Sequence, residues 1–155
     1  MRLKLNGTVA KAILVSLLAM AACGSNSTDT SKFVGTWKFT SGTITVNCPG
    51  SGVQTINVTG NAVVSKGTAS DLVVVDQDCS LKFDATNATT ATARPSQACT
   101  TTGSSSTEVD TYSDVVFSTQ DGSTGHLSAS LTGVISSGGS SVTCTATESA
   151  DLQKL

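Results

Sequence analysis

Apolar and polar residues alternate over several stretches of the chain. Apolar residues or glycine stand at every second position in residues 33–39, 44–48, 127–135 and 142–146, with mostly threonine and serine between them. A period of two is that of a β-strand with one dry and one solvated face. Threonine is β-branched and polar, which suits the solvated face. These stretches therefore predict half-buried strands.

Short turn sequences separate the alternating stretches. Pro-Gly-Ser-Gly at 49–52, Gly-Asn at 60–61, Asp-Gly-Ser at 121–123 and Ser-Gly-Gly-Ser at 137–140 are each suited to a hairpin. Further strands are expected at residues 53–59, 62–66, 72–76, 81–85, 89–93 and 109–119, and a loop at 94–107. Both faces of residues 72–75 are apolar, so this strand is expected to be covered on both sides or shielded by a loop.

About eight to ten short strands joined by tight turns predict an all-β fold. We expect an antiparallel meander that forms a closed or flattened β-barrel, with a β-sandwich as the alternative. Closure is favoured because it removes both sheet edges. The inward positions expected are Phe33, Trp37, Phe39, Ile44, Val46, Leu81, Phe83, Leu127, Leu131, Ile135 and Val142. The aromatic residues predict a plug near Trp37, with the other end narrow and at most a small cavity inside.

The amino-terminal residues predict export. Residues 1–11 carry three basic residues and no acid, and residues 12–22 are apolar apart from one serine. A basic segment followed by a short apolar run is typical of a secretory signal peptide. The run is shorter than the roughly 20 residues that a membrane-spanning helix needs. We assign residues 1–22 to the signal peptide.

The end of the apolar run resembles the lipobox of bacterial lipoproteins. Met-Ala-Ala-Cys occupies residues 20–23, with methionine where leucine is commoner. The resemblance implies that Cys23 is alkylated by a diacylglyceryl group and becomes the acylated amino terminus, anchoring the protein to the membrane. Gly24, in place of an aspartate, implies the outer membrane, on its periplasmic or surface face. Ordinary secretion is the alternative, because residues 19–21 also fit an A-x-A cleavage site.

The cysteine count agrees with lipidation. Of 5 cysteines, one must remain outside any set of intramolecular disulfides. With Cys23 as the lipid carrier, two bridges are expected in an oxidising compartment. Cys79 and Cys99 flank a predicted hairpin and should pair. Cys48 and Cys144 would then join an early strand to the last one, which a closed barrel makes neighbours.

The remaining chain is expected to form one domain. Residues 23–31 are the lipidated cysteine and a flexible polar tether, and residues 32–155 are the disulfide-bridged β-domain. Three of the 9 basic residues lie in the signal peptide, which leaves 6 against 11 acidic residues and a net charge of about −5. Basic residues are scattered singly, so nucleic acid is not expected as a partner. The membrane, reached through the acyl chains on Cys23, is the expected partner, and the sequence specifies no protein or small molecule.

A short motif in the first strand resembles the G-x-W signature of lipocalins. It is Gly-Thr-Trp at residues 35–37, and Asp-Thr-Tyr at 110–112 resembles the second motif of that family with two residues exchanged. The resemblance implies a barrel sealed by Trp37 and a carried apolar ligand, for which Trp37 and Phe39 are the candidate contacts. A lipocalin also stacks a late arginine on the tryptophan, whereas the late basic residue here is Lys154.

The sequence carries no recognisable catalytic motif. There is 1 histidine, His126, which alternation places on a polar face. The acids at 71, 76, 78 and 84 do not have EF-hand spacing. We therefore expect no cofactor, no metal and no enzymatic activity. The expected function is that of a lipid-anchored envelope lipoprotein with a binding or interaction domain, or alternatively a lipocalin-like carrier.

Overall fold

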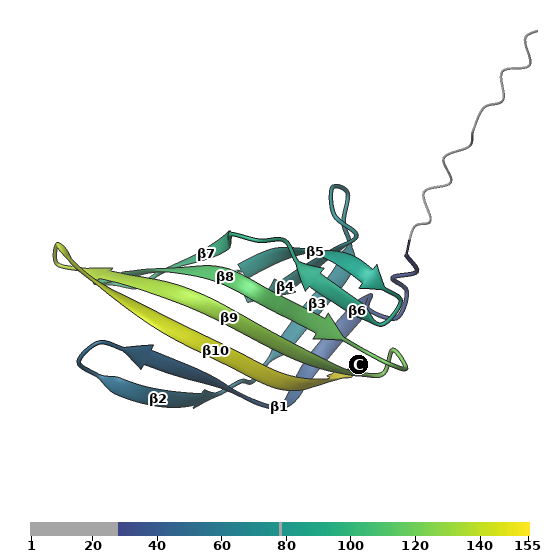
Figure 1. The fold of residues 1–155 in the computed structure, drawn as a ribbon, viewed down its shortest axis with the longest axis horizontal. Helices are drawn as coiled ribbons and strands as arrows, with labels where there is room; N and C mark the ends of the chain where they lie inside the picture. The colour runs from purple at the N-terminus through teal and green to yellow at the C-terminus, as the bar shows by residue number, and fades with distance from the viewer. Residues whose placement is uncertain (1–27, 78) are drawn as a thin grey trace, which may run out of the picture.

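The computed structural model describes residues 28–77 and 79–155, so the predicted signal peptide and Cys23 lie outside it. Its regular structure is entirely β-strand (Figure 1). The strands are β1 (Gly35–Cys48), β2 (Gly52–Asn57), β3 (Asn61–Lys66), β4 (Leu72–Asp76), β5 (Cys79–Asn87), β6 (Thr90–Ala93), β7 (Gln97–Thr102), β8 (Thr107–Ser118), β9 (Thr124–Ser137) and β10 (Ser140–Lys154). Over these residues no helix is long and apolar enough to cross a membrane.

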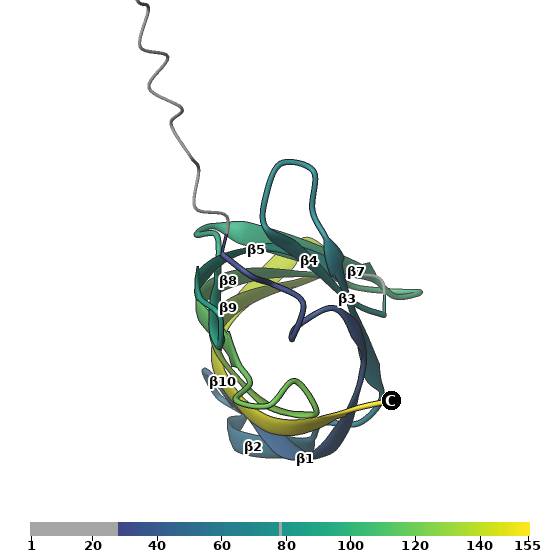
Figure 2. The same cartoon turned by 90° about the vertical axis from the view of Figure 1, so that its right-hand side faces the viewer.

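Eight of the strands close into an antiparallel barrel, which confirms the predicted fold class. The order around it is β1-β3-β4-β5-β6-β8-β9-β10, and β10 pairs with β1 to complete the ring. Figure 2 shows this ring nearly end-on. Strands β2 and β7 lie outside the closed path, β2 beside β1 and β7 beside β8.

The barrel is closed at one end and split at the other because β1 and β8 change partners along their length. The first part of β1 pairs with β3, and residues 43–48 pair with β2 instead. Likewise β8 pairs with β6 at residues 116–118 and with β7 at residues 107–112. Beyond the change the sheet runs β2-β1-β10-β9-β8-β7, with β2 and β7 as its edges. We call this region the split end.

Bulges in β1 and β8 keep the correct residues inside across the change of partner. In β1 the register shifts between Phe39 and Ser41, after which the inward residues carry even instead of odd numbers. In β8 the shift lies between Ser113 and Val116 and includes Asp114, whose φ is 50°. A bulge adds one residue to a strand and so reverses the alternation beyond it.

Aromatic side chains plug the closed end, as the sequence predicts. Trp37 is 0% exposed, and its Nε1 donates a hydrogen bond to the Phe33 carbonyl oxygen at 2.6 Å. The Phe117 ring meets both the Phe33 and the Trp37 rings edge-on. Lys154 Nζ lies 5.4 Å from the centre of the Trp37 ring, within the range of a cation–π contact. The segment before β1 crosses this end of the ring (Figure 2).

Both predicted disulfides are present. Cys48 is bonded to Cys144 across the β1–β10 pair. Cys79 is bonded to Cys99, which ties β7 to the start of β5. The first bridge confirms that the early and last strands meet.

Three local predictions were wrong. Residues 97–102 form β7, although residues 94–107 were expected to be a loop. Threonine on both faces of this segment hides the alternation of a strand. Pairing with β8 and the Cys79–Cys99 disulfide hold the strand in place. Val75 is 37% exposed, because β4 is a barrel wall with one solvated face. The end opposite Trp37 is open instead of narrow, and Val142 there is 43% exposed.

Candidate functional site

A cavity of about 370 Å³ lies at the split end, on the inner face of the sheet. Its apolar wall includes Ile44 and Val46 of β1 and Leu131 of β9. The opposite rim is formed by the β2–β3 connection and by the end of β4. We call this cavity the hollow. Its volume falls within the roughly 300–1,000 Å³ of small-molecule sites.

Four carboxylates and one phenol also line the hollow. Glu108, Asp110 and Tyr112 alternate along β8 before its bulge, Glu148 lies on β10, and Asp76 ends β4. The alternation of β8 and β10 turns these side chains inward. No lysine or arginine is among the lining residues. The hollow therefore combines an apolar wall with negative charge.

Glycine at position 133 makes room for one of the acids. Gly133 on β9 is paired in register with Asp110 on β8. A Cβ atom at Gly133 would lie 2.7 Å from Asp110 Oδ1, so the carboxylate rests directly over the glycine backbone. A larger residue at this position would push the carboxylate away from the wall.

Partial burial weakens Glu148, Asp76 and Asp110 as acids. It raises the pKa of Glu148 to about 6, with a smaller contribution from the charge of Asp76. Burial also raises the pKa of Asp76, and burial together with the nearby Glu108 raises that of Asp110. The pKa of Tyr112 rises to about 12, because burial and the neighbouring acids oppose its ionisation. A cation bound in the hollow would favour the ionised form of these carboxylates and so offset the cost of burying their charge.

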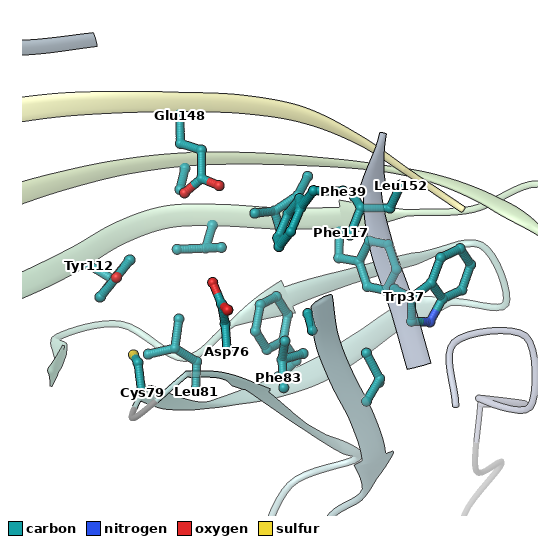
Figure 3. Close-up of a pocket in the computed structure, with 16 residues that line it drawn as sticks. Trp37, Phe39, Asp76, Cys79, Leu81, Phe83, Tyr112, Phe117, Glu148 and Leu152 are labelled. Carbon is teal, nitrogen blue, oxygen red and sulfur yellow. The ribbon is translucent and has the colours of Figure 1, made fainter. Parts of the chain in front are cut away.

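Three of these residues separate the hollow from the packed core. Asp76, Tyr112 and Glu148 also line a much smaller cavity of about 70 Å³, whose other walls are core side chains. Figure 3 shows Glu148 and Asp76 pointing toward one another from opposite walls. The polar groups thus form a partition across the barrel, with the aromatic plug on one side and the hollow on the other.

The residues proposed from the lipocalin resemblance lie on the core side of this partition. Trp37 and Phe39 are buried and line the small cavity, not the hollow (Figure 3). The disulfide cysteine Cys144 is part of the wall of the hollow. Cys23 lies outside the described residues, so its lipidation stays a prediction.

The acids that cluster in sequence between residues 71 and 84 separate in the structure. Asp84 forms an ion pair with Arg94 at 2.8 Å, and this contact lowers the pKa of the carboxyl. Asp71 accepts a hydrogen bond from the Ala85 backbone, whereas Asp76 faces the hollow. Within residues 28–77 and 79–155, no group of three or more histidine, cysteine or acidic residues is arranged to hold a metal ion.

Sequence reasoning missed the acidic side of the hollow, although a signal was present. In β10 the inward residues are Cys144, Ala146, Glu148, Ala150 and Leu152. When an acidic residue occupies one of the alternate positions that are otherwise apolar in a strand, its charge points inward. The same signal occurs in β4, where Asp76 follows Leu72 and Val74 in phase.

Comparison of the chain with protein-family models, with curated proteins and with solved structures finds no significant match.

Proposed function

We propose that this protein is an exported, lipid-anchored binding protein of the cell envelope, with a non-catalytic barrel that takes a small molecule into the hollow. The lipobox-like residues before Cys23 support the anchor. The observation that carries the binding function is the hollow itself, which is of ligand size, reaches solvent at the split end and has a mixed apolar and acidic lining.

The lining favours an organic cation with an apolar body. An ammonium group placed near Asp110 and the neighbouring Glu108 would form charge-assisted contacts, which are stronger in a partly dry site than in water. The alkyl part would cover Ile44, Val46 and Leu131. An anionic ligand would meet like charges from several directions.

The position of the tether agrees with this arrangement. The described chain begins beside the closed end, and the split end lies at the other end of the long axis (Figure 1). The hollow is at the split end. An acylated Cys23 would hold the closed end toward the membrane, because few residues join it to β1. The hollow would then open toward the aqueous phase, from which it takes its ligand.

The test compares three six-carbon probes by calorimetric titration. We expect n-hexylamine to bind at least about tenfold more tightly than n-hexanol, a difference of about 1.4 kcal/mol, and hexanoate not to bind. Asp110→Asn should remove the preference for the amine. Asp114→Asn is the matched control, since Asp114 lies on the same strand but is exposed at the bulge.

The alternatives give different results in the same titration. Equal affinity for amine and alcohol would support the lipocalin-like carrier of an apolar ligand instead. Failure of all three probes to bind would contradict the binding function. A preference for the amine that survives Asp110→Asn would contradict the placement of the ammonium group beside Asp110.

A further inference from the structure

Polar side chains form a hydrogen-bonded row on the outer wall of the barrel. His126 Nδ1 lies 2.8 Å from Asp151 Oδ1, and His126 Nε2 lies 3.4 Å from Ser149 Oγ. The second carboxylate oxygen of Asp151 accepts a hydrogen bond from Ser41 Oγ at 2.9 Å. The row runs across β9, β10 and β1, on the face opposite the hollow.

The register of the strands fixes the row. His126 of β9 is paired with Asp151 of β10, and Asp151 is paired with Ser41 of β1. Ser149 and Asp151 are two positions apart on β10, so their side chains share the outer face. Since β10 is paired on both sides, the backbone that carries the row is held in place.

The hydrogen bonds assign a role to each nitrogen of His126. An ionised carboxylate only accepts, so in the neutral ring Nδ1 carries the hydrogen and donates to Asp151. Nε2 is then the acceptor for the Ser149 hydroxyl. The hydrogen bonds from His126 and then Ser41 lower the pKa of Asp151, which keeps it ionised. This is the order of a serine nucleophile, its base and an orienting acid.

We propose that Ser149 is a nucleophilic serine that accepts an acyl group from an activated carboxylic ester. The Ser149 oxygen attacks the acyl carbon, and its proton passes to His126 Nε2. A new ester bond forms to Ser149, while the bond to the leaving oxygen breaks and the leaving group departs as an alkoxide or phenolate. His126 then returns the proton to solvent. This inference goes beyond the binding function and does not depend on the hollow.

The surroundings predict a single acylation in place of rapid turnover. The backbone N–H groups of β10 near Ser149 lie between two paired strands, so they belong to the ladders and do not form an oxyanion hole. Without such donors, attack of water on the acyl-serine is slow. His126 and Asp151 border an open depression of about 620 Å³, which gives the leaving group room.

The test is to react the purified full chain with p-nitrophenyl acetate and to map the acetylated residues by peptide mass spectrometry. Ser149 should be acetylated before the other serines of the chain. Ser149→Ala should abolish that modification, and His126→Gln should slow it at least about tenfold, at the low end of general-base effects. Ser128→Ala is the matched control, because Ser128 is paired with Ser149 but is not hydrogen-bonded to the His126 ring.

The dependence on pH distinguishes a base from a structural neighbour. The pH dependence of the rate at Ser149 should change in His126→Gln, because that variant lacks the proposed base. His126 is paired with Ser118 of β8, and Asp151 is paired with Ser41 of β1; neither serine is charged. Asp151 is the ionised group in contact with the His126 ring. Acetylation of Ser149 no faster than of Ser128, or a rate unchanged in His126→Gln, would overturn the proposal.

Discussion

At position 148 the inward face of β10 carries a carboxylate between two alanines. Burial raises the pKa of Glu148 to about 6, so at neutral pH the folded protein keeps a charge that water would solvate better. An apolar or amide side chain at this position would give a more stable barrel. Residues that oppose stability in this way are concentrated at functional sites. If Glu148 serves the proposed binding function, its replacement should therefore raise the free energy of unfolding.

Glu148→Gln should stabilise the protein at pH 7 by about 1–2 kcal/mol and leave it unchanged at pH 4. The folded pKa of about 6 exceeds the ordinary value of 4.5, so the folded state holds its proton more tightly than the unfolded state. The contribution of Glu148 to wild-type stability falls as pH rises from 4.5 through 6, and the variant lacks this contribution. Urea unfolding at the two pH values measures the difference. Equal stability of wild type and variant at pH 7 would mean that Glu148 is well solvated.

At the scale of the elements, the strands in which every second residue is apolar could be predicted from the sequence. The pairing of strands that are not joined by a hairpin could be predicted only in part. β9 and β10 have clear alternation and a Gly-Gly turn, and both were predicted. β7 has threonine on both faces, and only its pairing with β8 makes it a strand. The split end could not be predicted, because it results from bulges at which β1 and β8 change partners. A bulge has no necessary residue type and leaves only a reversed alternation in the sequence.

The Cys79–Cys99 bridge should hold the edge strand β7 in place. β7 pairs with β8 alone, and the side chain of Gln97 adds contacts to the Lys82 backbone. Replacing both cysteines by serine should accelerate amide exchange in β7 strongly, while β9 and β10 stay protected. The control is the double variant Cys48→Ser and Cys144→Ser, which should loosen β1 and β2 instead. Equal acceleration throughout the barrel would show that the bridge stabilises the whole fold.

At the scale of the whole molecule, the two ends have different roles. Phe33 and Trp37 seal the end where the described chain begins, and the opposite end opens into the hollow. The domain has an acidic balance of charge, which disfavours its attraction to an anionic membrane surface. The proposed acyl chains on Cys23 would supply the attachment, since two or more chains bind a membrane stably.

Mass spectrometry of the protein extracted from membranes should show residue 23 as an acylated amino terminus. Cys23→Ser should release the protein into the soluble fraction or leave the signal peptide attached. Cys23 is the cysteine without a partner in the disulfides described, so the substitution should not disturb the barrel. A mature terminus at Ala22 without lipid would contradict the anchor and support ordinary secretion.

Methyl NMR spectra recorded during titration with n-hexylamine test the central claim most directly. The methyl groups of Ile44, Val46 and Leu131 line the hollow, whereas those of Val64 and Val74 line the small cavity beside the plug. We expect the first group to shift in a saturable way and the second group to stay in place. Saturable shifts confined to Val64 and Val74, or no saturable shift in either group, would contradict a ligand site in the hollow.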